Sequence, residues 1–210
     1  MVTLVDDEVG RILDVLAEQG LNENTLVIFT SDHGELLGDH QMLLKGPMMF
    51  DCSVKVPLLV RWPGVVPAGT VAESLVEWID LAPTLLDAAG VTGLSPAQGR
   101  SLLPVLTGDP VWVERDWVLS EYRNSGQPYD PPVHTTMLRR GQHKLVVHHG
   151  PPSTPRERDG ELYDLSADPD ELVNRFHDPL AAELRRSLQE TLPDVLVGTE
   201  DRFQPRVSDF

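Results

Sequence analysis

Four side chains that can bind a metal or transfer a proton follow one apolar run near the start of the chain. Asp32, His33, His40 and Lys45 come shortly after the apolar residues 26–29. A carboxylate and a neutral imidazole are ligands that divalent cations accept, so Asp32 and His33 could occupy two positions on one ion. Lys45 would add a positive charge that could hold an anionic group and stabilise charge on a leaving oxygen. The combination favours a cation site that faces an anion.

The same residues also allow a simpler interpretation, an ordinary turn with a surface lysine. Gly34 would let the chain turn sharply, so that both side chains point to one place. A dedicated cation site usually has roughly four to six ligands, so others would be needed, with Glu35 and Asp39 as nearby candidates. His40 could act as a general acid, donate to an oxyanion or brace the loop, and we favour bracing.

A helix and a buried strand must position these residues. Apolar side chains at helical spacing predict an amphipathic helix over residues 5–19, which Gly20 would end. Residues 26–29 form a short continuous apolar run, typical of a strand buried on both faces in a parallel sheet between helices. Ligands of open α/β sheets bind beyond the carboxyl ends of parallel strands, where Asp32 and His33 would lie.

The rest of the chain predicts an α/β front half and an α+β back half. In the front half we expect two strands, a helix and a short helical turn, at residues 57–62, 76–79, 81–89 and 99–106 respectively. The back half predicts strands and a final helix, at residues 117–122, 135–139, 143–148, 161–165 and 179–192. The expected divisions are an α/β part with the metal motif, an antiparallel subdomain and a tail, at residues 1–108, 109–192 and 193–210.

Composition excludes several classes of function. The formal net charge of −16 argues against binding to nucleic acid or to a membrane surface, because both partners attract basic proteins. The chain has no apolar stretch long enough to span a membrane and no signal-like N-terminus. Cys52 is the single cysteine, so no intramolecular disulfide can form. We expect a cytoplasmic location by default, unless an N-terminal half with a signal is missing.

Several ordered motifs extend the pattern around the acid and the imidazole. They are Thr30-Ser31-Asp32-His33-Gly34-Glu35, Leu37-Gly38-Asp39-His40, Lys45, Val56-Pro57-Leu58-Leu59-Val60-Arg61-Trp62-Pro63-Gly64, Asp80-Leu81-Ala82-Pro83-Thr84, Gly99-Arg100-Ser101-Leu102, Lys144-Leu145-Val146 and Glu161-Leu162-Tyr163-Asp164-Leu165. With them, residues 3–180 resemble the C-terminal portion of the sulfatases. That family belongs to the alkaline phosphatase superfamily, in which the phosphonate monoester hydrolases are close relatives.

The resemblance implies an alkaline-phosphatase-like sandwich, with a mainly parallel sheet flanked by helices and a small antiparallel α+β subdomain after it. It implies that Asp32 and His33 are metal ligands, for Ca²⁺ first and Mn²⁺ or Mg²⁺ as alternatives. By the same match Lys45 contacts the sulfate or phosphate group, and His40 is carried over only weakly as a catalytic candidate. The family's nucleophile is a formylglycine made in a Cys/Ser-x-Pro-x-Arg motif. Cys52 does not match that motif, because Ser53-Val54-Lys55 follows it.

We therefore expect a sulfuric ester hydrolase of the sulfatase family, present as a truncated C-terminal half that lacks the nucleophile and is inactive alone. The expected substrate is a small anionic ester, and a missing N-terminal half or self-association would supply the partner. Two alternatives remain open. One is a phosphonate or phosphate ester hydrolase on the same scaffold, and the other is a non-catalytic remnant or one partner of a split enzyme.

Overall fold

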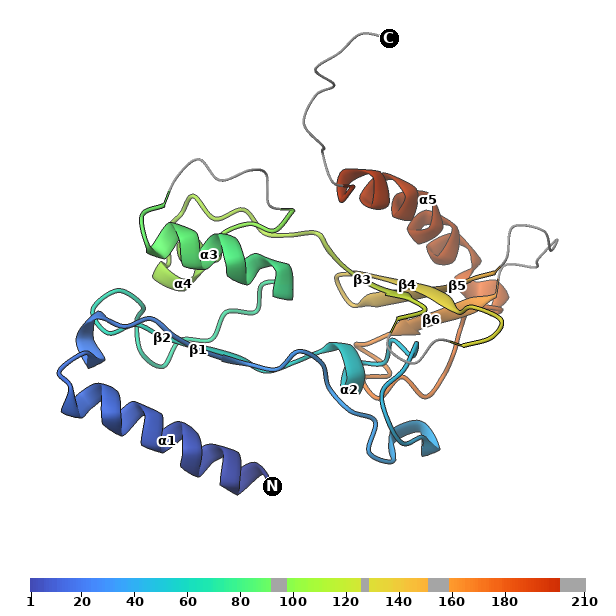
Figure 1. Ribbon diagram of the computed structural model, residues 1–210. Helices are drawn as coiled ribbons and strands as arrows, with labels where there is room; N and C mark the ends of the chain where they lie inside the picture. The colour runs from blue at the N-terminus through green and yellow to red at the C-terminus, as the bar shows by residue number, and fades with distance from the viewer. Residues whose placement is uncertain (92–97, 126–128, 151–158, 201–210) are drawn as a thin grey trace, which may run out of the picture.

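A computed structural model describes residues 1–91, 98–125, 129–150 and 159–200. Within these residues the strands form two antiparallel sheets (Figure 1). A two-stranded ribbon near the N-terminus pairs β1 (Val27–Thr30) with β2 (Leu58–Arg61). The larger sheet has the order β3-β4-β5-β6 and consists of β3 (Trp117–Arg123), β4 (His134–Arg140), β5 (His143–His149) and β6 (Gly160–Asp164).

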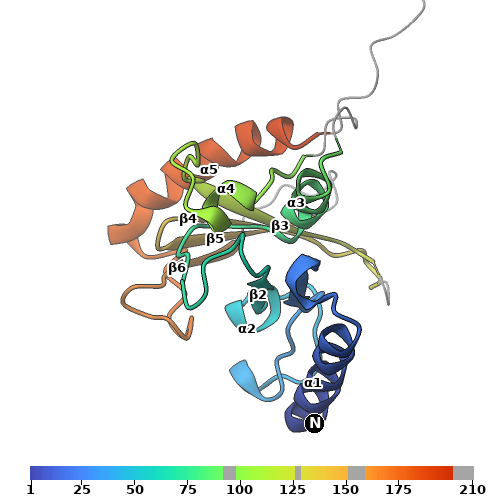
Figure 2. The same ribbon diagram turned by 90° about the vertical axis from the view of Figure 1, so that its left-hand side faces the viewer.

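The first helix, α1 (Val2–Glu18), agrees with the amphipathic pattern but contains no buried residue. Its apolar side chains at Val5, Ile12 and Val15 are each more than half exposed. The helix lies at the edge of the molecule beside the β1–β2 ribbon in both views (Figures 1 and 2). The apolar stripe predicted for a core therefore faces solvent in the described part of the chain.

The mainly parallel sheet expected around residues 26–29 is not confirmed. The strand β1 pairs antiparallel with β2, with Phe29 opposite Leu59. The prediction that this strand is buried on both faces is wrong, because Phe29 is 37% exposed and Leu59 is 60% exposed. A two-stranded ribbon cannot cover both of its own faces, and α1 does not bury them either.

Short helices and turns lie between the longer elements. The helices are α2 (Asp51–Val54), α3 (Leu81–Ala88) and α4 (Leu103–Thr107). The 3₁₀ turns are η1 (Asn22–Asn24), η2 (Asp39–Gln41), η3 (Trp78–Asp80) and η4 (Pro179–Ala181). None of the described helices has the length and apolar character needed to cross a bilayer.

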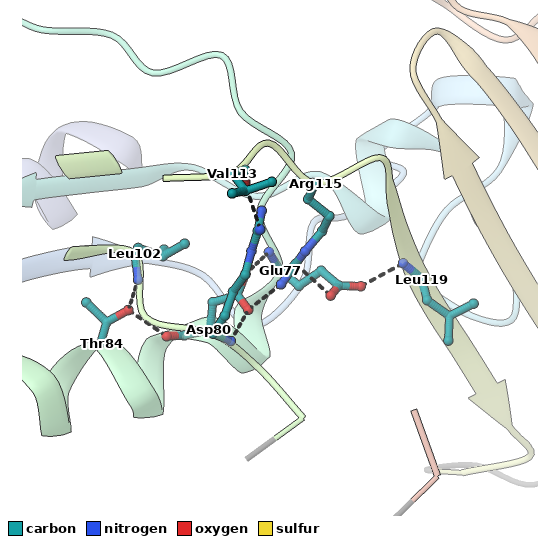
Figure 3. A network of polar contacts seen from close by, with 8 residues as sticks. Glu77, Asp80, Thr84, Leu102, Val113, Arg115 and Leu119 are labelled. Carbon is teal, nitrogen blue, oxygen red and sulfur yellow. Dashed lines mark hydrogen bonds and ion pairs between the residues drawn. The ribbon is translucent and has the colours of Figure 1, made fainter. Parts of the chain in front are cut away.

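The strand predicted at residues 76–79 is wrong, because a reciprocal cap starts a 3₁₀ turn there. The Asp80 carboxylate accepts a hydrogen bond from the Glu77 amide at 2.8 Å, and Glu77 closes the same capping box with its own side chain. The same two acids bind Arg115 at 2.7 Å each, and Glu77 also accepts from the Leu119 amide (Figure 3). This buried network ties the turn before α3 to β3 of the larger sheet.

The back half follows its predicted elements closely. The predicted hairpin at residues 135–148 is confirmed, with Leu138 opposite Leu145 across β4 and β5. The last helix, α5 (Ala182–Gly198), lies across one face of the sheet (Figures 1 and 2) and continues six residues past its predicted end at 192, with Pro193 inside it. Apolar burial sustains the extra turns, because a core forms between helix and sheet from Leu138, Leu145, Leu162, Phe176, Ala181, Leu188, Leu192 and Val195.

Candidate functional site

The loop after β1 brings three of the predicted site residues together. The Lys45 ammonium lies 2.5 Å from Nε2 of His33. Oδ2 of Asp32 lies 3.4 Å from the same nitrogen, and Oδ1 accepts a hydrogen bond from the His33 amide at 2.9 Å. The Ser31 hydroxyl donates to the His33 carbonyl at 2.8 Å and holds this turn. A carboxylate, an imidazole and an ammonium therefore converge on one point.

The hydrogen bonds assign the protons of His33. Nδ1 lies 2.7 Å from the Gly34 carbonyl, so Nδ1 carries the hydrogen and donates. The unprotonated Nε2 then accepts from the Lys45 ammonium. The pKa of Asp32 is lowered, chiefly by the hydrogen bond from the His33 amide, and the charge of Lys45 acts in the same direction. Asp32 is therefore an ionised, exposed carboxylate beside an imidazole whose Nε2 lone pair accepts from Lys45.

Gly34 is required for a different reason from the sharp turn expected of it. Its amide donates to the Ser53 carbonyl at 2.8 Å, which joins the loop to α2. A Cβ at position 34 would lie 1.9 Å from the Cys52 carbonyl oxygen. No side chain fits between these two backbones, so glycine permits the close approach that holds Asp32 and His33 against α2.

His40 lies apart from this cluster. Its ring stacks on Phe50, with centroids 3.6 Å apart and planes inclined by 9°. Neither His40 nor Asp39 lines the cleft that contains Asp32 and His33, whereas Glu35 does. This placement favours the bracing role among the alternatives for His40, because its φ of 52° and its stacked ring shape the loop rather than reach the cluster.

The cluster opens into a cleft of about 1190 Å³ between the loop after β1 and the face of β3 and β4. Asp32, His33 and Lys45 line one wall. The larger sheet and the loop after β3 also line the cleft, through Ser120, Glu121, Tyr122, Ser125, Tyr129, Met137 and Arg139. Residues far apart in the sequence therefore surround one space, which is somewhat larger than the usual small-molecule site.

A buried ionic cluster at the floor of the cleft was missed by sequence reasoning. Lys144 is fully buried, forms an ion pair with Glu171 at 2.6 Å and bonds both the Asp51 carboxylate and the Met49 carbonyl. Glu171 also accepts from the amide of Asp51, the first residue of α2. A lysine inside a predicted strand, directly before the apolar Leu145 and Val146, was the available signal. Its partners lie too far away in the sequence for a spacing pattern to find them.

Asp32 and His33 fit a divalent cation as two ligands but do not complete its shell. Their donor atoms lie 3.4 Å apart, close enough for one ion to contact both. Lys45 occupies Nε2 of His33, so a cation at that nitrogen would have to displace the ammonium. No group of three or more His, Cys, Asp or Glu side chains able to hold a metal occurs among the described residues. Further ligands would have to come from beyond them.

Comparison with known proteins identifies the family. Residues 38–197 match the family described as N-sulphoglucosamine sulphohydrolase, C-terminal, and residues 1–47 match type I phosphodiesterase / nucleotide pyrophosphatase. The chain is 32% identical over 197 residues to the N-acetylglucosamine-6-O-sulfatase of Bacteroides thetaiotaomicron, covering 92% of this chain and 34% of that protein. It is 37% identical over 180 residues to arylsulfatase K of Gallus gallus, covering 83% of this chain and 32% of that protein.

Solved structures agree. A protein in complex with its substrate D-glucosamine-2-N,6-O-disulfate matches with a TM-score of 0.83 and 29% identity, over 96% of this chain and 40% of that chain. The phosphonate monoester hydrolase of Agrobacterium radiobacter matches with a TM-score of 0.82 and 32% identity, over 96% and 41%. The chain spans about a third of the length of the curated relatives it matches. The protein therefore belongs to the sulfatase family, to which it is related through the family's C-terminal region.

Proposed function

We propose that this chain supplies one wall of a sulfatase active site, which hydrolyses a sulfuric ester with the help of a divalent cation. The observation that carries the proposal is the convergence of Asp32, His33 and Lys45 at the edge of a cleft. Two cation ligands beside an ammonium suit a sulfate group, because the cation and the ammonium can share its negative charge.

Each residue has a distinct role in this proposal. Asp32 and His33 hold Ca²⁺, which when bound polarises the ester oxygens. Lys45 leaves Nε2 of His33 and donates to a sulfate oxygen, so it neutralises charge that develops on the ester. The Nδ1 hydrogen bond of His33 to the Gly34 carbonyl keeps Nε2 directed toward the cation. His40 braces the loop through Phe50.

The nucleophile of this proposal lies outside the 210 residues. The sequence contains no Cys/Ser-x-Pro-x-Arg segment, and the curated relatives are about three times as long as the matched region. We therefore expect no turnover of an aryl sulfate by this chain alone, because removal of a nucleophile costs many orders of magnitude in rate. A segment or partner that carries the motif would complete the enzyme and the sheet beside β1.

A second candidate is the hydrolysis of phosphonate or phosphate monoesters at the same site. The structural match to a phosphonate monoester hydrolase, at 32% identity, favours it as much as a sulfatase match does. Both anions present tetrahedral oxygens of similar size, so the three side chains alone do not separate them.

Binding of inorganic sulfate to this chain in the presence of Ca²⁺ tests the proposed function. We expect calorimetry to show that Lys45→Ala weakens sulfate binding by about tenfold, the value of one charge-assisted hydrogen bond. Lys55→Ala is the matched control, since Lys55 lines the same cleft but its side chain is 71% exposed and lies 3.9 Å from Asp51. Equal losses in the two variants would show only general charge attraction and would refute the role of Lys45. The same titration with methylphosphonate ranks the two candidate anions.

A further inference from the structure

A pair of tyrosines in the same cleft as the cation ligands has no assigned role. Tyr122 lies at the end of β3 and Tyr129 in the loop that follows, and both line the cleft. Their rings meet edge to face, with centroids 6.3 Å apart and planes inclined by 72°. The geometry is a favourable one for two aromatic rings, so each ring fixes the orientation of the other.

Tyr129 is held firmly although its ring is open to the cleft. Its amide donates to Oδ1 of Asn124 at 2.9 Å, and its carbonyl accepts from the Asn124 amide group at 3.2 Å. Asn124 has a φ of 52°, a conformation that asparagine tolerates better than most residues. Tyr129 is nevertheless 46% exposed. Ordering an exposed aromatic residue through three specific contacts has a cost in entropy, which a binding role would offset.

The second ring is anchored to the core. Tyr122 packs against the cluster of Met49, Met137 and Val146, and its hydroxyl donates to the Ser125 carbonyl at 2.8 Å. The sheet therefore supports Tyr122, and Tyr122 supports Tyr129. A ring surface fixed in this way loses little freedom when a ligand stacks on it.

One of the two tyrosines also lies close in space to the chain at Lys45. A Cβ placed on Gly46 would be 3.2 Å from the Tyr129 hydroxyl, so this hydroxyl lies against the residue that follows Lys45. An ester whose charged group contacts Lys45 would therefore extend its alcohol portion along the cleft toward these rings.

We propose that Tyr122 and Tyr129 form a stacking subsite for a ring-bearing alcohol, the aryl or pyranose portion of the ester. The inference rests on the proposed function, because Lys45 anchors the other end of the ligand. The flat apolar face of either ring would lie on Tyr129, while Lys45 binds the sulfate. The subsite would thus favour ring esters over the bare anion.

The test compares three probes in the presence of Ca²⁺: 4-nitrophenyl sulfate, D-glucosamine 6-sulfate and inorganic sulfate. We expect calorimetry to show that at least one ring ester binds about three- to tenfold more tightly than inorganic sulfate, the range that one aromatic contact provides. Tyr129→Leu should abolish this preference and Tyr129→Phe should keep it, while both leave the affinity for inorganic sulfate unchanged. If 4-nitrophenyl sulfate loses its tighter binding in Tyr129→Leu, the subsite takes an aryl ring, and if D-glucosamine 6-sulfate loses it, the subsite takes a pyranose.

Phe29→Leu is the matched control, since Phe29 is also exposed but does not line the cleft. A preference for ring esters that survives Tyr129→Leu would overturn the subsite, as would its absence from the unmodified chain. Neither result would affect the role of Lys45. That role is tested separately, by the binding of inorganic sulfate and by its loss in Lys45→Ala.

A second measurement detects the contact directly in the unmodified chain. Nuclear Overhauser effects in the unmodified chain should connect ring protons of the bound ester to ring protons of Tyr129. The signals of the Tyr129 protons ortho to the hydroxyl are assigned as those that disappear from their positions in the spectrum of Tyr129→Phe. Contacts from the ester to other aromatic residues alone would contradict the proposal.

Discussion

Removal of the buried Lys144 charge should destabilise the protein strongly. The Lys144 side chain is fully buried, and the Glu171 side chain with which it pairs at 2.6 Å is 2% exposed. Lys144→Met keeps most of the side-chain volume but leaves the Glu171 carboxylate buried, with the Asp51 amide as its one remaining hydrogen-bond partner among the described residues. Loss of one member of a buried ion pair typically costs about 3–5 kcal/mol.

The structure also indicates where that cost arises. Asp51, the second carboxylate that Lys144 binds, is 22% exposed and lies 3.9 Å from both Lys55 and Arg139. Water and two other cations would therefore compensate Asp51, whereas Glu171 is 2% exposed and has no second cationic partner in the described part of the chain. We expect Glu171→Gln to recover a large part of the loss when added to Lys144→Met, because it removes the uncompensated charge and keeps the size of the side chain.

Urea-induced unfolding at pH 7, followed by far-ultraviolet circular dichroism, measures the free energies of unfolding for the unmodified chain, the two single variants and the double variant. A cost below about 1 kcal/mol for Lys144→Met would refute the reasoning that a buried charge is left behind. So would a double variant whose loss equals the sum of the two single losses, since the two groups would then be independent.

Three further predictions concern other parts of the chain. Gly34→Ala should cost about 1–3 kcal/mol of unfolding free energy, because its Cβ would lie 1.9 Å from the Cys52 carbonyl oxygen. Gly10→Ala is the control and should stabilise the protein slightly, because Gly10 has open space around it in α1. Equal effects of the two substitutions in urea unfolding would contradict the close approach at Gly34. The hydrogen bond to Glu161 raises the pKa of His148 above 6.5, so His148 contributes stability that is present below pH 6.5 and is lost as pH rises through its folded pKa. The loss of unfolding free energy in His148→Gln should therefore be larger at pH 5.5 than at pH 8.5, and it should stay under about 1 kcal/mol because the site is partly exposed. A loss independent of pH would contradict this prediction. The exposed apolar face of α1 should cause concentration-dependent self-association that Ile12→Lys reduces, and sedimentation velocity showing a monomer at all concentrations would refute this.

The family's motifs and the local elements could be predicted from the sequence because each depends on neighbouring residues. The strand, the turn and the pair Asp32 and His33 all lie within one short segment, so their proximity follows from the chain itself. The hairpin at residues 135–148 was predicted for the same reason, since alternating residues flank a Gly-containing turn and pair locally.

Burial was predicted less well, because it depends on what lies opposite a residue. The apolar runs of α1 and β1 indicated a core, yet both remain largely exposed, since no other described element covers them. Conversely, Lys144 carries a charge of the kind that mostly lies at a surface, and it is buried because Asp51 and Glu171 reach it from distant segments.

The residue types of the site were thus determined by the sequence alone, while their partners were decided by the tertiary structure. A carboxylate, an imidazole and an ammonium can be identified as chemistry wherever they stand. Only the tertiary structure brings Lys45 onto His33, stacks His40 on Phe50 and places Tyr129 in the same cleft. These contacts join segments separated by many residues, and no periodicity along the chain encodes them.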